Sequence, residues 1–308
     1  MIKKFKRLSR QISRNPLTSR HRVSALARYL RHQVLTRFGI KGGVLGWVLP
    51  FVDHTQVLAR PDGYLNRIST FGLPEPSEMA FLLHSLAPSD VFLDVGANVG
   101  AYTVLASGVI GASSIAIEPI PSALSELKLN LSLNNIEDQV IIVPMAVGDR
   151  VATARMESNR GTTNRIASTD SLTDVLEVPL TTLDEVVPLD VRSLVVKIDV
   201  EGYETASIMG ATRLLTSGSV QALIVETMGH GARYGYQESK LHEQILSFGY
   251  ESCEYDPIHR QLLPGAPYKR LAKKYVTDST IYVRNVSAMT MRLREARHFH
   301  VHGTGTDL

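Results

Sequence analysis

Residues 91–100 decide the fold, and they read Val-Phe-Leu-Asp-Val-Gly-Ala-Asn-Val-Gly. The first five form a mostly apolar run that is typical of a buried strand. Gly96 and Gly100 allow a tight turn directly after that strand, and residues 101–109 are predicted to form a helix. A strand, a glycine-containing turn and a helix in this order predict a ligand-binding loop at the edge of an open α/β sheet.

Strand and helix patterns alternate along the rest of the chain. Residues 150–188 break this alternation with Thr-, Ser- and Asn-rich stretches, and we expect an inserted β excursion of one or more hairpins there. The last two strands are joined by a proline-containing loop and are expected to pair antiparallel. These segments predict an α/β fold with a Rossmann-like, doubly wound sheet. Further strands are predicted over 114–118, 140–144, 194–200, 220–226, 250–255 and 280–283, and further helices near 122–133, 203–215 and 238–248.

The composition excludes several classes of protein. The chain has 308 residues, of which 44% are hydrophobic and 20% are charged. These values are close to those of soluble globular proteins, and they exclude a disordered, collagenous or disulfide-stapled chain. Cys253 is the single cysteine, and no apolar run approaches the roughly 18 residues of a membrane span. This composition is typical of a cytoplasmic protein.

Charge is distributed unevenly along the chain. Residues 1–52 contain 12 Lys and Arg and no Asp or Glu, which leaves 21 of the 33 basic residues against all 30 acidic residues afterwards. We therefore divide the chain into a basic arm over 1–52, a body over 53–286 and a C-terminal tail over 287–308. The tail is expected to be loose from His298 onward. A basic arm on an acidic body predicts an anionic partner for the arm.

The arm contains one predicted amphipathic helix, from about Ser24 to before Gly39. Three interpretations stay open for it. In the first, residues 1–43 bind an anionic membrane surface on the inner face of a membrane. In the second, the helix packs on the body. In the third, the arm is a mitochondrial targeting segment. Nucleic acid is not favoured as a partner, because no aromatic-rich basic motif is present. The apolar stripe of the helix consists of Val23, Leu26, Leu30, Val34 and Phe38.

The loop after the first strand favours a ligand with a ribose but no phosphates. Glu118 stands 24 positions after Asp94, at the end of the second strand, where an acidic side chain binds ribose hydroxyls. Asn98 and Ala101 occupy positions at which a dinucleotide fingerprint has glycine, and the Asp94 carboxylate would repel a pyrophosphate. A nicotinamide-dependent oxidoreductase is therefore disfavoured. S-adenosylmethionine, which carries a ribose and an ammonium group, fits this pattern better.

On these residues the chain resembles the FkbM-type family of class I S-adenosylmethionine-dependent methyltransferases. The resemblance covers roughly 72–286, and it implies a seven-stranded sheet whose last strand is antiparallel. It also implies methyl transfer to a hydroxyl of a sugar, glycan or tailored natural product. The matching segments are Gly-Leu-Pro-Glu-Pro at 72–76, Phe-Leu-Asp-Val-Gly-Ala-Asn-Val-Gly-Ala-Tyr-Thr at 92–103, Ala-Ile-Glu-Pro at 116–119, Thr-Leu-Asp at 182–184, Lys-Ile-Asp-Val-Glu-Gly-Tyr-Glu at 197–204 and Ile-Val-Glu at 224–226.

The resemblance also implies a set of cofactor-binding residues. Glu118 would bind the ribose of S-adenosylmethionine, while Ala146 and Val147 would lie near its adenine. The methionine end would be held by Asp94, Gly96, Asn98 and Gly100. The predicted cofactor site is completed by Ala97, Tyr102, Thr103 and Pro119.

Three carboxylates at strand ends are the candidate catalytic residues. A methyl acceptor hydroxyl must lose a proton, and Asp199, Glu201 and Glu226 follow the fourth and fifth strands next to the predicted crevice. The same acids are candidate ligands for a divalent cation such as Mg²⁺, although Lys197 is placed to neutralise Asp199. We expect His230 to be a loop residue without a function.

Two other functions stay open. An RNA-directed methyltransferase would use the basic arm, but the Asn/Asp-Pro-Pro-aromatic motif of amino-directed enzymes is absent after the fourth strand. A noncatalytic membrane-associated adaptor could retain the fold, but the acids at strand ends would then have no physical role. The acceptor itself is undefined by the sequence, because its pocket is expected from the inserted segment and the late loops.

Overall fold

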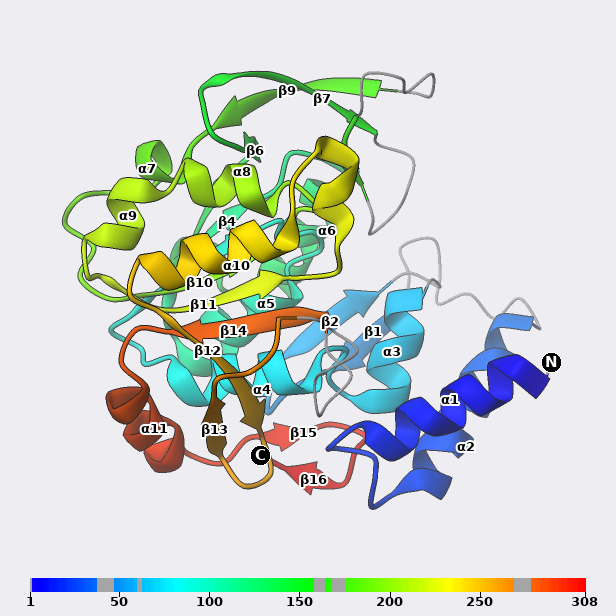
Figure 1. Cartoon of the computed structure of the whole chain (residues 1–308). Helices are drawn as coiled ribbons and strands as arrows, with labels where there is room; N and C mark the ends of the chain where they lie inside the picture. Colours follow the sequence, from blue (N-terminus) through cyan, green and yellow to red (C-terminus); the bar gives the residue numbers. More distant parts are fainter. Residues whose placement is uncertain (1, 38–46, 60–62, 158–163, 168–174, 269–277) are drawn as a thin grey trace.

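The main sheet has eight strands in the order β13-β12-β14-β11-β10-β3-β4-β5 (Figure 1). The structure is a computed structural model that describes residues 2–37, 47–59, 63–157, 164–167, 175–268 and 278–308. β5, β4, β3, β10 and β11 are parallel, and β14 lies antiparallel between β11 and β12. The strands are β3 (Val91–Val95), β4 (Ser113–Ile117), β5 (Val140–Val143), β10 (Leu194–Ile198), β11 (Val220–Glu226), β12 (Glu251–Asp256), β13 (Gln261–Pro264) and β14 (Ser279–Val283).

Helices cover both faces of this sheet. The predicted helix at 101–109 begins as α5 and continues in π-helical turns, and the helix predicted over 203–215 is split into α8 and α9. The helices of the body are α4 (Pro76–Ser85), α5 (Ala101–Thr103) with its π-helical continuation η1 (Val104–Ile110), α6 (Pro121–Leu133), η2 (Glu137–Gln139), α7 (Leu183–Val186), α8 (Glu204–Met209), α9 (Thr212–Thr216), η4 (His230–Tyr234), α10 (Glu238–Ser247) and α11 (Val286–Glu295).

The strand residues alternate between two hydrophobic layers. Val195 of β10 packs in the layer that contains α4 and α11, whereas Val196 and Ile198 pack in the layer that contains α8, α9 and α10. A strand buried on both faces reads as a continuous apolar run, which explains why the parallel strands were predictable from the sequence. β3 has β4 on one side and β10 on the other, so a crevice opens at the carboxyl ends of these strands.

The predicted seven strands are present, and the last of them, β14, is antiparallel as expected. The structure adds an eighth strand, β13, which forms a hairpin with β12 at the edge of the sheet. We expected a loop here because Pro257 and Pro264 interrupt the strand pattern. An edge strand tolerates proline, since its outer N–H groups need no partner in the sheet.

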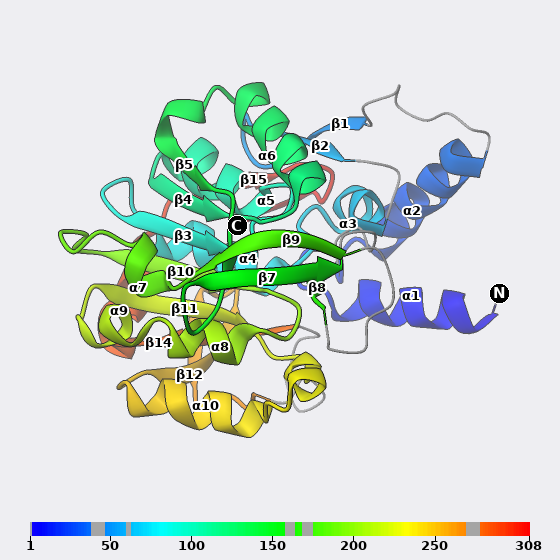
Figure 2. The same cartoon turned by 90° about the horizontal axis from the view of Figure 1, so that it is seen from above.

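The inserted segment supplies three strands of a second, four-stranded sheet, which confirms the predicted β excursion. Its strand order is β6-β9-β7-β8, and β7 and β9 form its long antiparallel hairpin across the crevice side of the body (Figure 2). β6 pairs parallel with β9 and so ties the hairpin to the segment that follows β5. The strands are β6 (Ala146–Val147), β7 (Ala152–Glu157), β8 (Arg165–Ile166) and β9 (Val175–Thr181).

The basic arm contains two helices that pack against the body. The predicted helix is present as α2, although Phe38 lies outside the described residues. Its buried contact is Ala25, and Arg28 donates hydrogen bonds to the carbonyl groups of Ser69 and Thr70. The first helix, α1, was not predicted. The elements here are α1 (Ile2–Arg14), α2 (Arg22–Arg37), β1 (Trp47–Pro50), β2 (Gln56–Ala59) and α3 (Gly63–Phe71).

Of the described residues in the predicted apolar stripe of α2, only Leu26 packs against the buried cluster of Leu8, Ile12, Ala25 and Phe71. Val23 is 84% exposed, Leu30 51% and Val34 52%. The helix therefore packs on the body, as one interpretation proposed, while most of its apolar stripe faces solvent. In the part of the chain that the structure describes, every helix is too short or too polar for a membrane span.

The expectation of a loose tail after His298 is wrong. A hairpin of β15 (His300–Val301) and β16 (Thr306–Asp307) closes the chain, and Phe299, Val301 and Leu308 are buried. The His302 N–H donates to the Phe51 carbonyl, so the tail is fixed against the segment that follows β1. The physical reason is the alternation of apolar residues with the three histidines, which is a strand pattern.

Candidate active site

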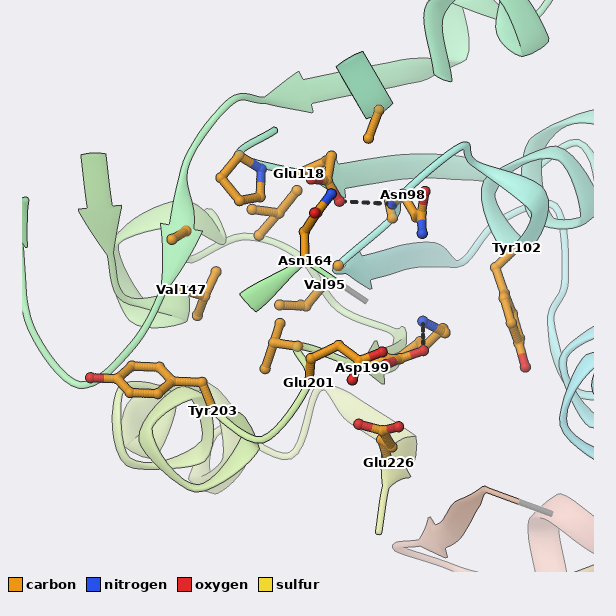
Figure 3. A pocket seen from close by; sticks show the side chains of 18 of the residues that line it. Val95, Asn98, Tyr102, Glu118, Val147, Asn164, Asp199, Glu201, Tyr203 and Glu226 are labelled. Carbon is orange, nitrogen blue, oxygen red and sulfur yellow. Dashed lines mark hydrogen bonds and ion pairs between the residues drawn. The ribbon is translucent and has the colours of Figure 1, made fainter. Parts of the chain in front are cut away.

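A cavity of about 330 Å³ opens at the carboxyl ends of the parallel strands (Figure 3). The loops after β3, β4, β5 and β10 line it, and so does Glu226 at the end of β11. Met156 and Ile166 of the inserted sheet close one side. Of the predicted cofactor residues, the cavity wall contains Gly96, Ala97, Asn98, Tyr102, Glu118, Pro119, Ala146 and Val147; all three predicted catalytic acids also line it.

The loop after β3 is shaped by close backbone packing. Gly96 has a φ of +78°, and a Cβ atom at this position would lie 1.9 Å from the Asp199 carbonyl oxygen. The N–H groups of Gly96 and Ala97 both donate to the Ile117 carbonyl at the end of β4. The loop is thus fixed against both neighbours of β3, because a glycine allows the end of β10 to approach it.

Glu118 is held at the mouth of this loop. Its Oε2 accepts the Asn98 N–H at 2.9 Å (Figure 3), and its Oε1 accepts the Ile120 N–H at 2.9 Å. Burial raises the pKa of Glu118 to about 7, although these two hydrogen bonds oppose the shift. Each carboxylate oxygen keeps acceptor capacity for a further donor. The carboxylate is therefore placed to accept hydrogen bonds from a diol in the cavity.

Asp94 does not line the cavity. It lies behind the wall, where the Thr103 hydroxyl donates to its Oδ2 at 2.7 Å and the Lys197 ammonium lies 4.0 Å from its Oδ1. Burial raises the pKa of Asp94. Gly100 and Thr103 are likewise absent from the cavity wall. These three predicted cofactor residues support the loop rather than face the cavity.

Lys197 connects the buried acids to the cavity, which the sequence analysis anticipated only for Asp199. Its Nζ lies 3.0 Å from Asp199 Oδ2 and 5.0 Å from the centre of the Tyr102 ring. Burial lowers the pKa of Lys197, but Asp199, Asp94 and Glu75 outweigh it and hold that pKa above its ordinary value. The ammonium therefore stays charged and neutralises part of the acidic wall.

Glu75 was missed as a site residue. It lines the cavity, and the Tyr102 hydroxyl donates to its Oε2 at 2.6 Å. Burial raises the pKa of Glu75. The signal was available, because Glu75 belongs to the matching segment at 72–76, but that segment precedes the first strand and no ligand role was assigned to it.

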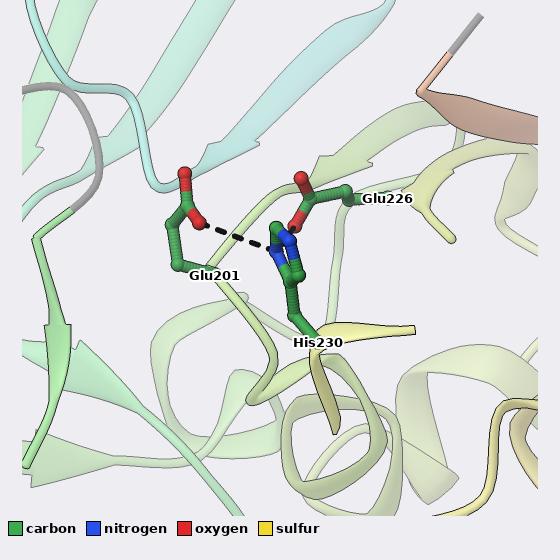
Figure 4. Close-up of side chains that lie close together, drawn as sticks. All are labelled: Glu201, Glu226 and His230. Carbon is green, nitrogen blue, oxygen red and sulfur yellow. Dashed lines mark ion pairs between the residues drawn. The ribbon is translucent and has the colours of Figure 1, made fainter. Parts of the chain in front are cut away.

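The carboxylates after β10 and β11 diverge into two groups. Asp199 pairs with Lys197, whereas Glu201 and Glu226 face His230 (Figure 4). Burial, followed by the charge of Asp199, raises the pKa of Glu201 to about 7 and holds that of Glu226 well above its ordinary value. Burial lowers the pKa of His230. We expected His230 to be a loop residue without a function, but it lines the cavity together with Glu201 and Glu226.

The charge of the wall favours a cationic ligand. Six Asp or Glu side chains line the cavity, against the basic side chains of Arg67 and Lys197. Burial raises the pKa values of four of these acids, Glu75, Glu118, Glu201 and Glu226, so a bound cation would favour their ionised forms whereas a pyrophosphate would oppose them. A ribose-containing sulfonium compound meets both the charge and the fixed Glu118 carboxylate.

The sequence profile of the FkbM methyltransferase domain matches residues 94–257, more than half of the chain. This chain belongs to the FkbM methyltransferase family. The matched residues run from β3 to the end of β12, so they include the loop after β3, Glu118 and the acids after β10 and β11. The matched family is one of methyltransferases.

Several solved methyltransferase structures are similar to this member of the FkbM family. The FkbM methyltransferase from Methylobacillus flagellatus KT aligns with a TM-score of 0.44 and 15% identity over 71% of this chain, which spans 52% of that protein. The precorrin-6y C5,15-methyltransferase from Geobacter metallireducens GS-15 aligns with a TM-score of 0.36 and 15% identity, and the alignment covers 68% of this chain and 87% of that protein. The S-adenosylmethionine-dependent O-methyltransferase from Thermotoga maritima aligns with a TM-score of 0.35 and 11% identity, and the alignment covers 73% of this chain and 72% of that protein. No curated protein sequence matches the chain.

Proposed function

We propose that the protein transfers a methyl group from S-adenosylmethionine to a hydroxyl of a sugar, a glycan or a related natural product. The observation that carries this proposal is the Glu118 carboxylate, fixed by two backbone N–H groups beside the loop after β3, in a cavity with an excess of acids. This arrangement fits a cofactor with one ribose and a positive charge. When bound, S-adenosylmethionine supplies an electrophilic methyl group.

The residues that hold the cofactor follow from their places in the wall. Glu118 binds the ribose hydroxyls, and Gly96, Ala97 and Asn98 form the floor beneath it. Ala146 and Val147, with Pro119, provide the apolar surface for the adenine. Tyr102 and Glu75 stand at the methionine end, while Asp94, Gly100 and Thr103 hold the loop from behind.

Asp199 is the best-placed acceptor for the proton of the substrate hydroxyl. Its side chain is 31% exposed and lines the cavity, while Lys197 donates to its Oδ2 at 3.0 Å. The lysine orients the carboxylate and leaves acceptor capacity toward the cavity. In the proposed transfer the oxygen would form its new bond to the methyl carbon as the S–CH₃ bond breaks, with S-adenosylhomocysteine as the leaving group. The hydroxyl O–H bond would break and its proton would pass to Asp199.

Polar and aromatic side chains next to β8, before α8 and around η4 support a sugar as the acceptor. Tyr203 and Asn164 line the cavity, and the Tyr203 ring meets the rings of Tyr234 and Tyr236 edge to face. Rings of this kind cover the apolar faces of a sugar, and an amide pairs with its hydroxyls. Nothing comparable to a base-flipping pocket is needed for such an acceptor.

The test is transfer of a labelled methyl group to free and lipid-linked sugars, with total RNA as the competing acceptor class. We expect labelled sugar, and we expect Asp199→Asn to lower turnover by about 10²-fold or more while S-adenosylmethionine still binds. Labelled RNA without labelled sugar would favour the RNA-directed alternative. Binding of the cofactor without transfer to any acceptor would favour the adaptor.

We also propose that the arm places the protein on an anionic membrane surface. Val23, Leu30 and Val34 lie seven and four residues apart, so they share one exposed face of α2. The surrounding residues 1–52 contain 12 basic and no acidic side chains. An apolar stripe flanked by basic residues suits the headgroup region of an anionic leaflet, where a lipid-linked glycan would be within reach.

A further inference from the structure

Three side chains from separate segments converge on one side of the cavity (Figure 4). Glu201 lies in the turn after β10, Glu226 ends β11 and His230 begins η4. One donor atom of each lies within 4.8 Å of the others. His230 Nδ1 is 3.3 Å from Glu201 Oε2 and 3.7 Å from Glu226 Oε2. All three residues also line the cavity.

The two separations from His230 Nδ1 fit neighbouring ligands of one metal ion. Metal bonds of about 2.0–2.2 Å place neighbouring ligand atoms about 3.0–3.5 Å apart in octahedral or tetrahedral geometry. The two distances from His230 Nδ1, 3.3 Å and 3.7 Å, lie within a few tenths of an ångström of this range. Two carboxylates and one imidazole form a donor set that suits Mn²⁺ or Zn²⁺.

A second observation points to a cation rather than to an internal pair. Within the described residues, the buried Glu226 Oε2 and His230 Nδ1 atoms have no hydrogen-bond partner. The Glu226 side chain is only 10% exposed, and its Oε2 points toward His230. Buried polar atoms without a partner are costly, and a cation between them would satisfy both at once.

The backbone brings the two segments together. A Cβ atom on Gly202 would lie 2.7 Å from the His230 carbonyl oxygen, so only glycine allows the turn that carries Glu201 to approach η4 this closely. The Arg233 guanidinium donates to the Glu201 carbonyl at 3.1 Å and fixes the same turn. Asp199 is outside this cluster, because Lys197 holds its carboxylate.

We infer that Glu201, Glu226 and His230 bind one divalent cation of the Mn²⁺ or Zn²⁺ type at the acceptor side of the cavity. The assignment of a role rests on the proposed function: the cation coordinates the acceptor hydroxyl, weakens its O–H bond and directs its oxygen toward the methyl group. The proton still passes to Asp199. The site replaces the set of three acids expected from the sequence with two acids and a histidine.

The test uses the full chain, stripped of metal and without cofactor. Mn²⁺ is titrated and followed by loss of the free-ion spin resonance signal, and Zn²⁺ is titrated by calorimetry. We expect one equivalent of either ion to bind, and Glu226→Gln and His230→Gln each to weaken its affinity at least tenfold. His259→Gln is the matched control. His259 Nδ1 lies 3.0 Å from Asp256 Oδ2 in a similar pair, and neither residue lines the cavity.

S-adenosylmethionine binding is measured on the same samples, so that the two proposals can fail separately. Metal binding lost in the variants with cofactor binding retained would support the site. A folded wild-type protein that binds the cofactor but no stoichiometric metal would overturn it. Metal affinity that both substitutions leave unchanged would overturn it as well; unfolding midpoints identify any variant that fails to fold, and Glu201→Gln then replaces that variant.

Discussion

Six Asp or Glu side chains line the cavity against one Lys and one Arg, whereas the arm over 1–52 has 12 Lys and Arg residues and no Asp or Glu. The two regions also differ in how closely their structure follows from local sequence. The loop after β3 is held by backbone contacts on both sides, so its residues have one available arrangement. In the arm, the spacing of apolar residues predicts a helix but not the face that packs, and Ala25 rather than the Val23 stripe is buried. Local motifs therefore predict the loop after β3, whereas tertiary contacts decide which face of the arm packs.

Gly96→Ala is expected to have the largest effect on the cavity. The added Cβ would lie 1.9 Å from the Asp199 carbonyl oxygen in a backbone with a φ of +78°. We expect a loss of about 4 kcal/mol or more in the free energy of unfolding, since backbone overlap adds to the left-handed penalty of about 1–2 kcal/mol. Gly111→Ala is the control, because Gly111 has a φ of +82° with nothing within 4 Å. Equal losses in urea unfolding of both variants would contradict the close packing.

Lys197→Met comes next, and it tests whether the buried acids depend on one ammonium. Its removal leaves Asp94 and Asp199 without their cation, and we expect the free energy of unfolding at pH 7 to fall by about 3 kcal/mol. Lys240→Met should leave stability unchanged, because the Lys240 pair with Glu243 is a surface pair. An unfolding curve for Lys197→Met that matches the wild type would show that the acids need no neutralisation.

The pH dependence of cofactor binding tests the role of Glu118. Burial raises its pKa to about 7, so the native carboxyl keeps a proton below that pH, and its ionised form becomes available as pH rises. If the ionised form accepts the ribose hydroxyls, affinity for S-adenosylmethionine should be about tenfold weaker at pH 6 than at pH 8. Glu118→Gln should flatten this profile. The stability of the free protein should depend on pH in the opposite direction. Because folding raises the pKa of Glu118, this group contributes most to the free energy of unfolding below its unfolded pKa, and the contribution is lost as pH rises through about 7.

The arm should show the smallest effect on the folded protein. Replacing Val23, Leu30 and Val34 by Ser changes exposed positions, so we expect stability and cofactor affinity to stay within about 0.5 kcal/mol of the wild type. Flotation with vesicles rich in phosphatidylserine should nevertheless show clearly weaker binding. Vesicle binding equal to that of the wild type would remove the support for a membrane-facing stripe. Ala27→Ser is the control, because Ala27 lies on the same helix but outside the stripe.

Much of the body could be predicted because its signals are local. β3 and β11 have the predicted bounds, and Glu118 meets the loop after β3 as the spacing indicates. The misses lie at the edge of the main sheet and in the tail. β13 contains Pro264, which a sheet edge tolerates, and the tail hairpin buries Phe299 and Val301, which alternate with His298, His300 and His302.

The candidate site shows the same division. Residues close to the glycine loop were identified from their order along the chain, but the inward position of Asp94 depends on Thr103 and Lys197. His230 was missed because nothing in its own sequence surroundings indicates that Gly202 brings the Glu201 turn against it. Pairings of this kind follow from the packed fold alone.

The central claim is that the acidic cavity binds S-adenosylmethionine through Glu118. Calorimetric titration of the purified full chain with S-adenosylmethionine, and separately with NADH, tests it most directly. The account predicts saturable binding of S-adenosylmethionine, no binding of NADH, and a loss of about 2–3 kcal/mol, or roughly 30- to 150-fold in affinity, for Glu118→Ala. A folded wild-type protein that does not bind S-adenosylmethionine, or a Glu118→Ala variant that binds it as well as the wild type, would contradict the account.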